Sequence, residues 1–176
     1  LHALNSLASA QSKGTKETKE AMIHFLHYCE THPNATIQFK ASDMILTIHS
    51  DASYLTESQA RSRAGGYFYL GNKNESMQNN GAIHIIAKII KNVVSSAAEA
   101  EIAGVFINAK EAVPIRQALI EMGHPQPATK IITDNSTASG ILNKSCKQVR
   151  YKAIDMRYYW VRDRISQKQF NLIWKR

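Results

Sequence analysis

Three strand-like apolar segments follow one another directly over residues 43–90. Connections as short as those between them join antiparallel neighbours, so the three segments predict an antiparallel meander. In the first segment, apolar residues occupy both parities, which is typical of a strand that is buried on both faces. The strands are expected at 43–54, 64–71 and 81–90, and the polar connections at 55–63 and 72–80.

After residue 90 the pattern changes to helices that alternate with short strands. Pro114 is expected to end or kink the first helix, because proline lacks a backbone N–H and clashes with the preceding turn. The order (three strands, helix, strand, two helices, strand) predicts an α/β fold, a mixed five-stranded sheet flanked by helices. The expected helices are 95–112, 114–123, 134–142 and 152–168, and the expected strands are 129–133 and 169–174.

An amphipathic helix is predicted at 15–31, ahead of the first strand. Its apolar residues recur at helical spacing, Thr15 is its expected N-cap, and Pro33 follows its end. Since no strand precedes this helix, we expect the chain to divide into residues 1–36 and a second domain over residues 37–176.

Composition excludes several classes of protein. No apolar run approaches the roughly 18 residues that a membrane helix needs, so we expect no membrane partner. The N-terminus lacks the basic start and apolar block of a signal peptide. The two cysteines, Cys29 and Cys146, do not make a disulfide framework, which favours a reducing compartment.

Positive charge is concentrated near the C-terminal end. The chain has 22 Lys and Arg against 14 Asp and Glu, a net charge of +8. Residues 1–143 hold 12 basic and 12 acidic side chains, whereas residues 144–176 hold 10 basic and 2 acidic ones. Six of the 14 aromatic residues also lie in 144–176. A basic segment with interleaved aromatics fits a polyanion-binding face, although a solvated helix with buried aromatics has the same composition.

Three carboxylates stand at unusual places in this pattern. Asp51 closes an otherwise apolar strand, Glu101 lies on a helix that is apolar almost all round, and Asp134 follows a short strand. Each has an ordinary structural interpretation. Asp51 would cap a turn, Glu101 would be an exposed acid favoured by the helix dipole, and Asp134 would be an N-cap.

Together the three acids favour a metal site. Two acids at strand ends and one on a covering helix can converge on one point, where their charges would repel strongly. Divalent cations stabilise such an arrangement, and hard oxygen ligands select Mg²⁺ or Mn²⁺. Two such ions, about 4 Å apart, can activate a water and stabilise the leaving oxygen in phosphodiester cleavage.

A zinc site on the first helix is the competing metal hypothesis. His24, His27, Cys29 and His32 are residue types that zinc accepts. The two helical histidines are three positions apart, Cys29 points elsewhere, and a second ligand pair is lacking. The sequence therefore favours the carboxylate site.

Several blocks resemble the ribonuclease H domain of copia-type LTR retrotransposon polyproteins. SDASY (50–54), SSAAEAEIAGVF (95–106) and TDNSTASGI (133–141) look like its Asp, Glu and Asp motifs. KAIDMRYYWVRD (152–163) is similar to the helix that follows, and residues 5–33 resemble the end of the preceding reverse transcriptase. The resemblance covers nearly the whole chain in the right order.

The resemblance implies a ribonuclease H fold and endonucleolytic cleavage of the RNA strand of RNA–DNA hybrids during reverse transcription. It assigns Asp51, Glu101 and Asp134 as the catalytic and metal-binding acids, with Mg²⁺ or Mn²⁺, two ions, as cofactor. It also implies the reverse transcriptase of the same polyprotein as a partner, and a cytoplasmic virus-like particle or the nucleus as location. The candidate phosphate contacts in the basic segment are Lys144, Lys147, Arg150, Lys152 and Arg157.

One departure from the family pattern leaves a second hypothesis open. The family usually has a fourth acid after the last strand, and the sequence ends at Lys175-Arg176, so we expect the domain to be truncated before its final helix. Asp155 is a poor substitute, because it precedes that strand. The alternative is a module that binds hybrid without cutting it. An integrase-like nuclease is excluded by order, because no Glu follows Glu121.

Overall fold

The structure is a computed structural model, and it describes residues 2–73, 79–143 and 155–175. The chain forms two compact units, Leu1–Gln38 and Phe39–Arg176. That the first unit is the end of a reverse transcriptase stays a prediction.

The first unit consists of two helices. They are α1 (His2–Ala10) and α2 (Lys16–Thr31), joined by a 3-10 turn, η1 (Gln11–Lys13). α2 begins at the expected cap, where the Thr15 hydroxyl accepts a hydrogen bond from the Thr18 backbone N–H at 3.3 Å. The sequence does not predict α1, which is short and has no charged first or last turn. No side chain of either helix is buried.

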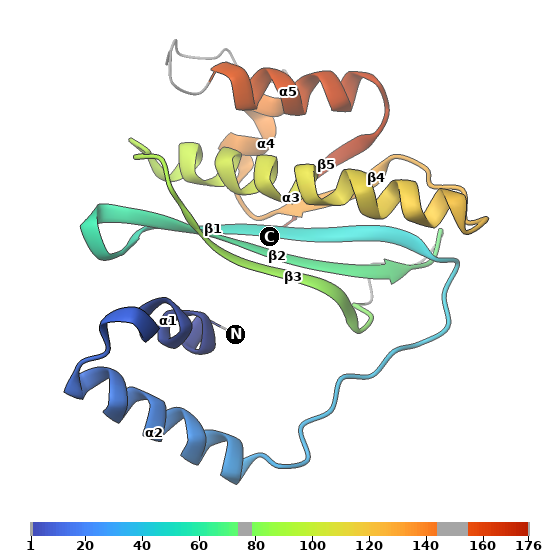
Figure 1. Ribbon diagram of the computed structural model, residues 1–176. Helices are drawn as coiled ribbons and strands as arrows, with labels where there is room; N and C mark the ends of the chain where they lie inside the picture. Colours follow the sequence, from blue (N-terminus) through green and yellow to red (C-terminus); the bar gives the residue numbers. More distant parts are fainter. Residues whose placement is uncertain (1, 74–78, 144–154, 176) are drawn as a thin grey trace. The chain divides into compact units, whose positions relative to one another are not determined.

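Five strands of the second unit form one mixed sheet in the order β3-β2-β1-β4-β5 (Figure 1). β1 pairs with β2, and β2 with β3, in antiparallel fashion, whereas β1, β4 and β5 run parallel. The predicted fold class is therefore confirmed. The strands are β1 (Ile45–Glu57), β2 (Arg61–Gly71), β3 (Ala82–Ile90), β4 (Thr129–Thr133) and β5 (Phe170–Trp174).

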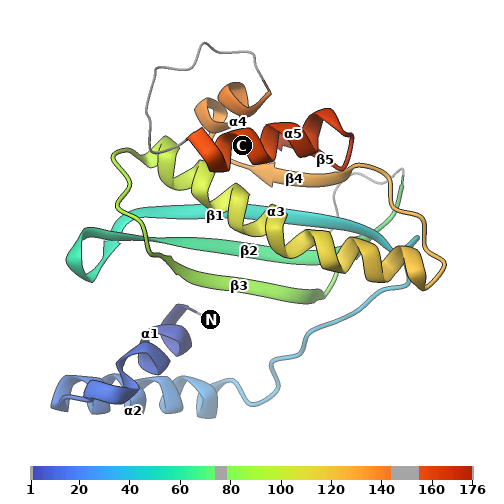
Figure 2. The ribbon, with the colours of Figure 1, turned by 45° about the horizontal axis from the view of Figure 1, so that its top comes forward.

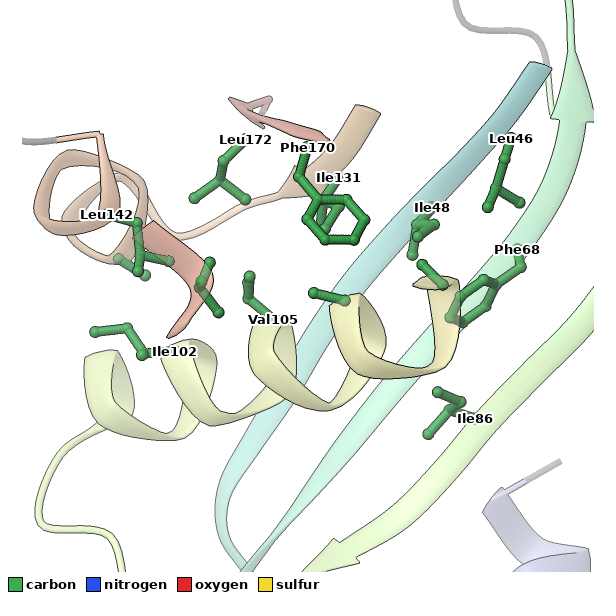
Figure 3. Packing of buried hydrophobic residues seen from close by; sticks show 14 of the residues in the cluster. Leu46, Ile48, Phe68, Ile86, Ile102, Val105, Ile131, Leu142, Phe170 and Leu172 are labelled. Atoms are coloured by element: carbon green, nitrogen blue, oxygen red, sulfur yellow. The ribbon is translucent and has the colours of Figure 1, made fainter. Parts of the chain in front are cut away.

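Three helices of this unit, α3 (Ala97–Glu121), α4 (Ser136–Leu142) and α5 (Asp155–Ser166), cover one face of the sheet (Figures 1 and 2). Side chains from all three meet β1, β2, β4 and β5 in one hydrophobic core, which Figure 3 shows around Ile48 and Val105. As predicted, the start of β1 is buried at both parities, from Ile45 through Ile48. β1 is the middle strand of the sheet, and it lies between β2 and β4 and against α3.

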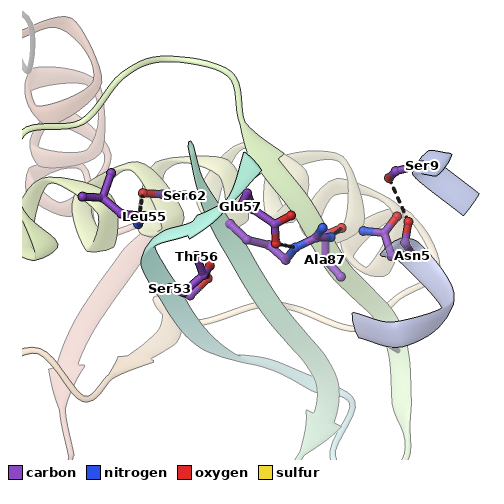
Figure 4. A network of polar contacts seen from close by, with 9 residues as sticks. Asn5, Ser9, Ser53, Leu55, Thr56, Glu57, Ser62 and Ala87 are labelled. Atoms are coloured by element: carbon purple, nitrogen blue, oxygen red, sulfur yellow. Dashed lines mark hydrogen bonds and ion pairs between the residues drawn. The ribbon is translucent and has the colours of Figure 1, made fainter. Parts of the chain in front are cut away.

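The β1–β2 hairpin extends much further than the sequence predicts. The polar composition of residues 55–63 predicts a loop, but only a short 3-10 turn, η2 (Ser58–Ala60), separates the two strands. Arg63 is 5% exposed and bonds Glu57 at 2.6 Å and the Ala87 carbonyl at 3.2 Å (Figure 4). Tertiary pairing of these charged side chains supplies the order that an apolar pattern could not indicate.

α3 runs without interruption through Pro114, so the predicted break is wrong. Pro114 lies on the exposed face of the helix, and so does Lys110, whose carbonyl loses its hydrogen-bond partner. Water can solvate that carbonyl. Ala109, Ala112 and Leu119 on the opposite face are buried, and their packing keeps the helix on the sheet.

Candidate metal centre

Asp51 lies within β1, opposite Gly65 of β2. β1 continues to Glu57, so Asp51 does not cap a turn, and that interpretation is wrong. Its side chain is exposed even though the first half of the strand is buried. An extended, paired backbone therefore holds this carboxylate at the surface of the sheet.

Glu101 lies in the second turn of α3 and is 5% exposed. One carboxylate oxygen accepts a hydrogen bond from the Ala52 backbone N–H at 3.2 Å, and the other from the Thr133 hydroxyl at 3.5 Å. The acid in the first turn is Glu99 instead, which is half-buried and accepts hydrogen bonds from the backbone and side chain of Ser95. Glu101 is thus a buried carboxylate that bridges β1 and β4.

Gly104, one turn after Glu101, lets α3 approach β1 closely. A Cβ atom at this position would lie 3.3 Å from both the Ala52 Cβ and the Asp51 carbonyl oxygen. A larger residue would push the helix away from the strand. The small residue therefore brings Glu101 within reach of the acid on β1.

Asp134 follows the last residue of β4 and does not cap α4. The cap is Asn135, whose side-chain oxygen accepts a hydrogen bond from the Ala138 N–H at 2.9 Å. The N-cap interpretation of Asp134 is therefore wrong by one residue. The Asp134 backbone carbonyl accepts a hydrogen bond from the Trp174 indole at 3.0 Å, and its side chain is exposed.

The structure brings the three acids together. Asp51, Glu101 and Asp134 each offer a carboxylate oxygen, and these oxygens all lie within 4.8 Å of one another. Burial, followed by the charges of Asp51 and Asp134, raises the pKa of Glu101 to about 7. A proton or a cation relieves this repulsion. The donors are hard oxygens, so the set fits Mg²⁺ or Mn²⁺ and not a soft metal.

A pH dependence of the metal-free protein follows from Glu101. Its pKa is raised from 4.5 to about 7 in the folded state, so between these values the native state holds a proton that the unfolded state has lost. The free energy of unfolding therefore falls as pH rises through this window, by at most about 3.5 kcal/mol at about 1.4 kcal/mol per pKa unit. We expect Glu101→Gln to remove this fall.

Urea denaturation in EDTA at several pH values between about 4.5 and 8 measures the pH dependence of the free energy of unfolding. The comparison of the two proteins cancels other titrating groups, such as His49, whose pKa burial lowers. If the free energy of unfolding had the same pH dependence in wild type and in Glu101→Gln, the pKa of Glu101 would not be raised in the folded state.

Of the five predicted phosphate-binding residues, the structure describes one. Lys144, Lys147, Arg150 and Lys152 lie outside the described residues. Arg157, on α5, donates to the Asn92 side chain and stacks over the Phe106 ring at 5.9 Å. Its guanidinium is thus partly engaged within the domain.

The zinc hypothesis has no geometric support in the part of the chain that the structure describes. There, the carboxylate group of Asp51, Glu101 and Asp134 is the one cluster of metal-ligand side chains. A second cluster is not formed by His24, His27, Cys29 and His32.

Among the described helices, none is long and apolar enough to cross a bilayer.

Comparisons with known proteins agree with this fold. No protein-family model matches the chain. The retrovirus-related Pol polyprotein from transposon TNT 1-94 of Nicotiana tabacum is 26% identical over 172 residues. These residues make up 98% of this chain but 12% of the polyprotein, so the chain spans a small part of its relative.

Solved structures of ribonucleases H superpose on most of the chain. One, isolated from compost by a metagenomic approach, has a TM-score of 0.55 at 9% identity and covers 75% of this chain and 84% of its own. The chain has a ribonuclease H fold and is related to a retrotransposon Pol polyprotein. The resemblance to copia-type polyproteins is thereby confirmed.

Two further ribonuclease H structures share the fold. The N-terminal ribonuclease H domain of a Mycobacterium tuberculosis protein has a TM-score of 0.52 at 12% identity, covering 75% of this chain and 87% of its own. The compost enzyme in complex with an RNA/DNA hybrid has a TM-score of 0.51 at 9% identity, covering 74% and 83%. At these identities the likeness concerns the fold.

Sequence reasoning missed the residues that support the three acids. Thr133 contacts Glu101, Gly104 sets the helix approach, and Trp174 holds the Asp134 carbonyl. Threonine is common in strands, so Thr133 gave no signal. Gly104 was a weak signal, because glycine is unfavourable inside a helix and often marks a close approach there. Trp174, an aromatic residue at the end of a strand and followed by Lys175-Arg176, was a second weak signal.

Proposed function

We propose that this domain is a divalent-metal-dependent ribonuclease that cleaves the RNA strand of RNA–DNA hybrids during retrotransposon reverse transcription. The observation that carries the proposal is the convergence of three carboxylates, from β1, α3 and the end of β4, within 4.8 Å. The ribonuclease H fold supports it, as does the related structure that holds an RNA/DNA hybrid.

Asp51, Glu101 and Asp134 are the proposed catalytic and metal-binding residues. Asp51 and Glu101 would hold one Mg²⁺ or Mn²⁺ ion, and Asp51 and Asp134 a second. Bound divalent ions supply a nucleophilic water and stabilise the charge that develops on the leaving oxygen. Cleavage would leave 3′-hydroxyl and 5′-phosphate ends.

Each acid has its own part in this scheme. Hydrogen bonds from Ala52 and Thr133 fix the buried Glu101 carboxylate. Its side chain would therefore not have to move when a divalent cation binds. Asp51 and Asp134 are exposed, so solvent and a bound duplex could reach their carboxylates. The site thus combines one rigid buried ligand with two accessible ones.

Substrate binding is proposed to use Lys144, Lys147, Arg150, Lys152 and Arg157. A hybrid duplex is recognised mainly through phosphates, by charges that displace counterions. We expect Lys147→Glu with Arg150→Glu to weaken hybrid binding and flatten its salt dependence, by roughly one unit of the log–log slope for each lost phosphate contact.

Fluorescence anisotropy with a labelled hybrid over a range of salt concentrations measures this slope. The matched control is Lys16→Glu with Lys19→Glu, which makes the same change in net charge on α2. If the salt slope is the same in both double variants, Lys147 and Arg150 do not contact phosphate.

Cleavage of a labelled hybrid, with Mg²⁺ or Mn²⁺ and with EDTA, tests the proposed function. We expect cuts in the RNA strand of the hybrid in the presence of either ion, and no cuts in duplex DNA or in EDTA. Binding of hybrid without cleavage in Mn²⁺ would favour the alternative, a hybrid-binding module of the reverse transcriptase. If the protein neither bound nor cleaved the hybrid, both the nuclease and the hybrid-binding hypotheses would be refuted.

The proposed setting is that of the related polyprotein. The partners would be the RNA–DNA hybrid and the reverse transcriptase portion of the same polyprotein, in a cytoplasmic virus-like particle or in the nucleus. The similarity over 98% of the chain to a Pol polyprotein supports this placement.

A further inference from the structure

Trp174, the last residue of β5, is a large aromatic residue that remains half exposed. Its relative exposure is 50%, although β5 begins with fully packed residues such as Phe170. Its indole N–H donates to the Asp134 backbone carbonyl at 3.0 Å. The position of this side chain is thus tied to a polar contact at the carboxylate cluster, and not to burial in the core.

The bend that carries Asp134 is held from several directions. The Lys175 N–H donates to the Thr133 carbonyl at 3.0 Å, and the Asn135 N–H donates to the Thr133 hydroxyl at 3.2 Å. These bonds fix Thr133 and Asn135, the two residues that flank Asp134. Trp174 contacts the backbone of Asp134 itself.

We infer that Trp174 is a positioning residue, which holds the Asp134 carbonyl so that the Asp134 carboxylate stays within reach of Asp51 and Glu101. The inference rests on the proposed function, because it assigns Trp174 an effect on divalent-ion binding. Asp134 is exposed and lies on a bend, so neither burial nor a helix cap fixes its side chain. Groups that orient a metal ligand typically change metal affinity when they are removed.

Trp160 offers a matched control within the same domain. It lies on α5, where its ring packs edge-on against Phe106 with centroids 5.4 Å apart and beneath the Arg164 guanidinium at 5.1 Å. Its contacts are thus made by the ring. A Trp→Phe change therefore removes an N–H donor at both sites, but at Trp174 alone it removes a donor to a carboxylate-bearing residue of the cluster.

Calorimetric titration with Mn²⁺ tests the inference without any need for activity. We expect Trp174→Phe to weaken Mn²⁺ binding roughly 5-fold, the effect of one ordinary hydrogen bond, while Trp160→Phe stays within about 2-fold of wild type. At limiting Mn²⁺, hybrid cleavage by Trp174→Phe should fall, and saturating Mn²⁺ should restore it. A purely structural role of Trp174 would not give this rescue.

A second protein removes the hydrogen bond while it keeps the shape of the side chain. In the Trp160→Phe background, benzothienylalanine replaces Trp174 alone, with a sulfur atom where the indole has its N–H. Weaker Mn²⁺ binding in this protein, at an unchanged melting temperature, supports the inference. Wild-type affinity in both Trp174 proteins overturns it while the proposed function stands. Absence of Mn²⁺ binding in wild type overturns the proposed function, and the inference with it.

Discussion

An Asp51→Asn variant should fold normally and lose cleavage of the RNA strand by more than about 100-fold, the upper range for loss of groups that merely support metal ligands. The substitution keeps the shape of the side chain and removes the charge that a divalent cation needs. Asp51 is exposed, and its backbone, not its side chain, pairs with Gly65. The β1–β2 register should therefore persist.

The stability of this variant should not fall, for an electrostatic reason. The Asp51 charge is one of the causes that raise the pKa of Glu101, so its removal relieves repulsion in the metal-free protein. We expect a melting temperature in EDTA equal to or above that of wild type. Asp163→Asn, an exposed position on α5, makes the same charge change away from the cluster and should cleave normally.

Rate measurements on a labelled hybrid at saturating Mg²⁺ or Mn²⁺ decide this prediction. If Asp51→Asn retained more than about a tenth of the wild-type rate, Asp51 would not be a metal ligand in the reaction.

The largest expected effect on stability comes from Gly66→Ala. A Cβ atom on Gly66 would lie 2.0 Å from the side-chain oxygen of Asn108. Asn108 is fully buried, and its amide donates to the Ser50 hydroxyl at 2.9 Å and to the Gly65 carbonyl at 2.8 Å. The amide cannot move without loss of both bonds, so overpacking and unsatisfied polar groups add up to about 3–5 kcal/mol.

Gly65→Ala is the matched control, on the neighbouring residue of the same strand. Its Cβ would meet Asp51 atoms at 3.6 and 3.8 Å, which are ordinary contacts. Chemical denaturation of both variants should therefore show a large loss for Gly66→Ala and a change within about 1 kcal/mol for Gly65→Ala. Equal denaturation midpoints for the two variants would mean that α3 moves to accommodate the new methyl group. Asn108 would then not fix the distance between α3 and the sheet.

Local patterns predicted most of the fold. The apolar residues Ile45, Leu46 and Ile48 occupy both parities and mark a strand that is buried on both faces, which lies at the middle of the sheet. The apolar character around Glu101 likewise indicated a buried carboxylate, because a helix that is apolar all round must be covered. These features depend on residues close in sequence, which is why they could be predicted.

The errors came from features that a local apolar pattern does not encode. The hairpin extension depends on Arg63 meeting Glu57, and continuity at Pro114 depends on burial of the opposite helix face. The cap of α4 was assigned one residue early, since Asp134 and Asn135 are both good N-caps and only the structure distinguishes them. The convergence of three acids could be expected from the sequence, but the side chains that orient them could not.

The most direct measurement is a crystal of this protein soaked in millimolar Mn²⁺ at about pH 8, where Glu101 has lost its proton. An anomalous difference map should show manganese bound by Asp51, Glu101 and Asp134. A map with no peak among these three carboxylates, from protein that has kept its fold, would contradict the proposal that they form a metal centre.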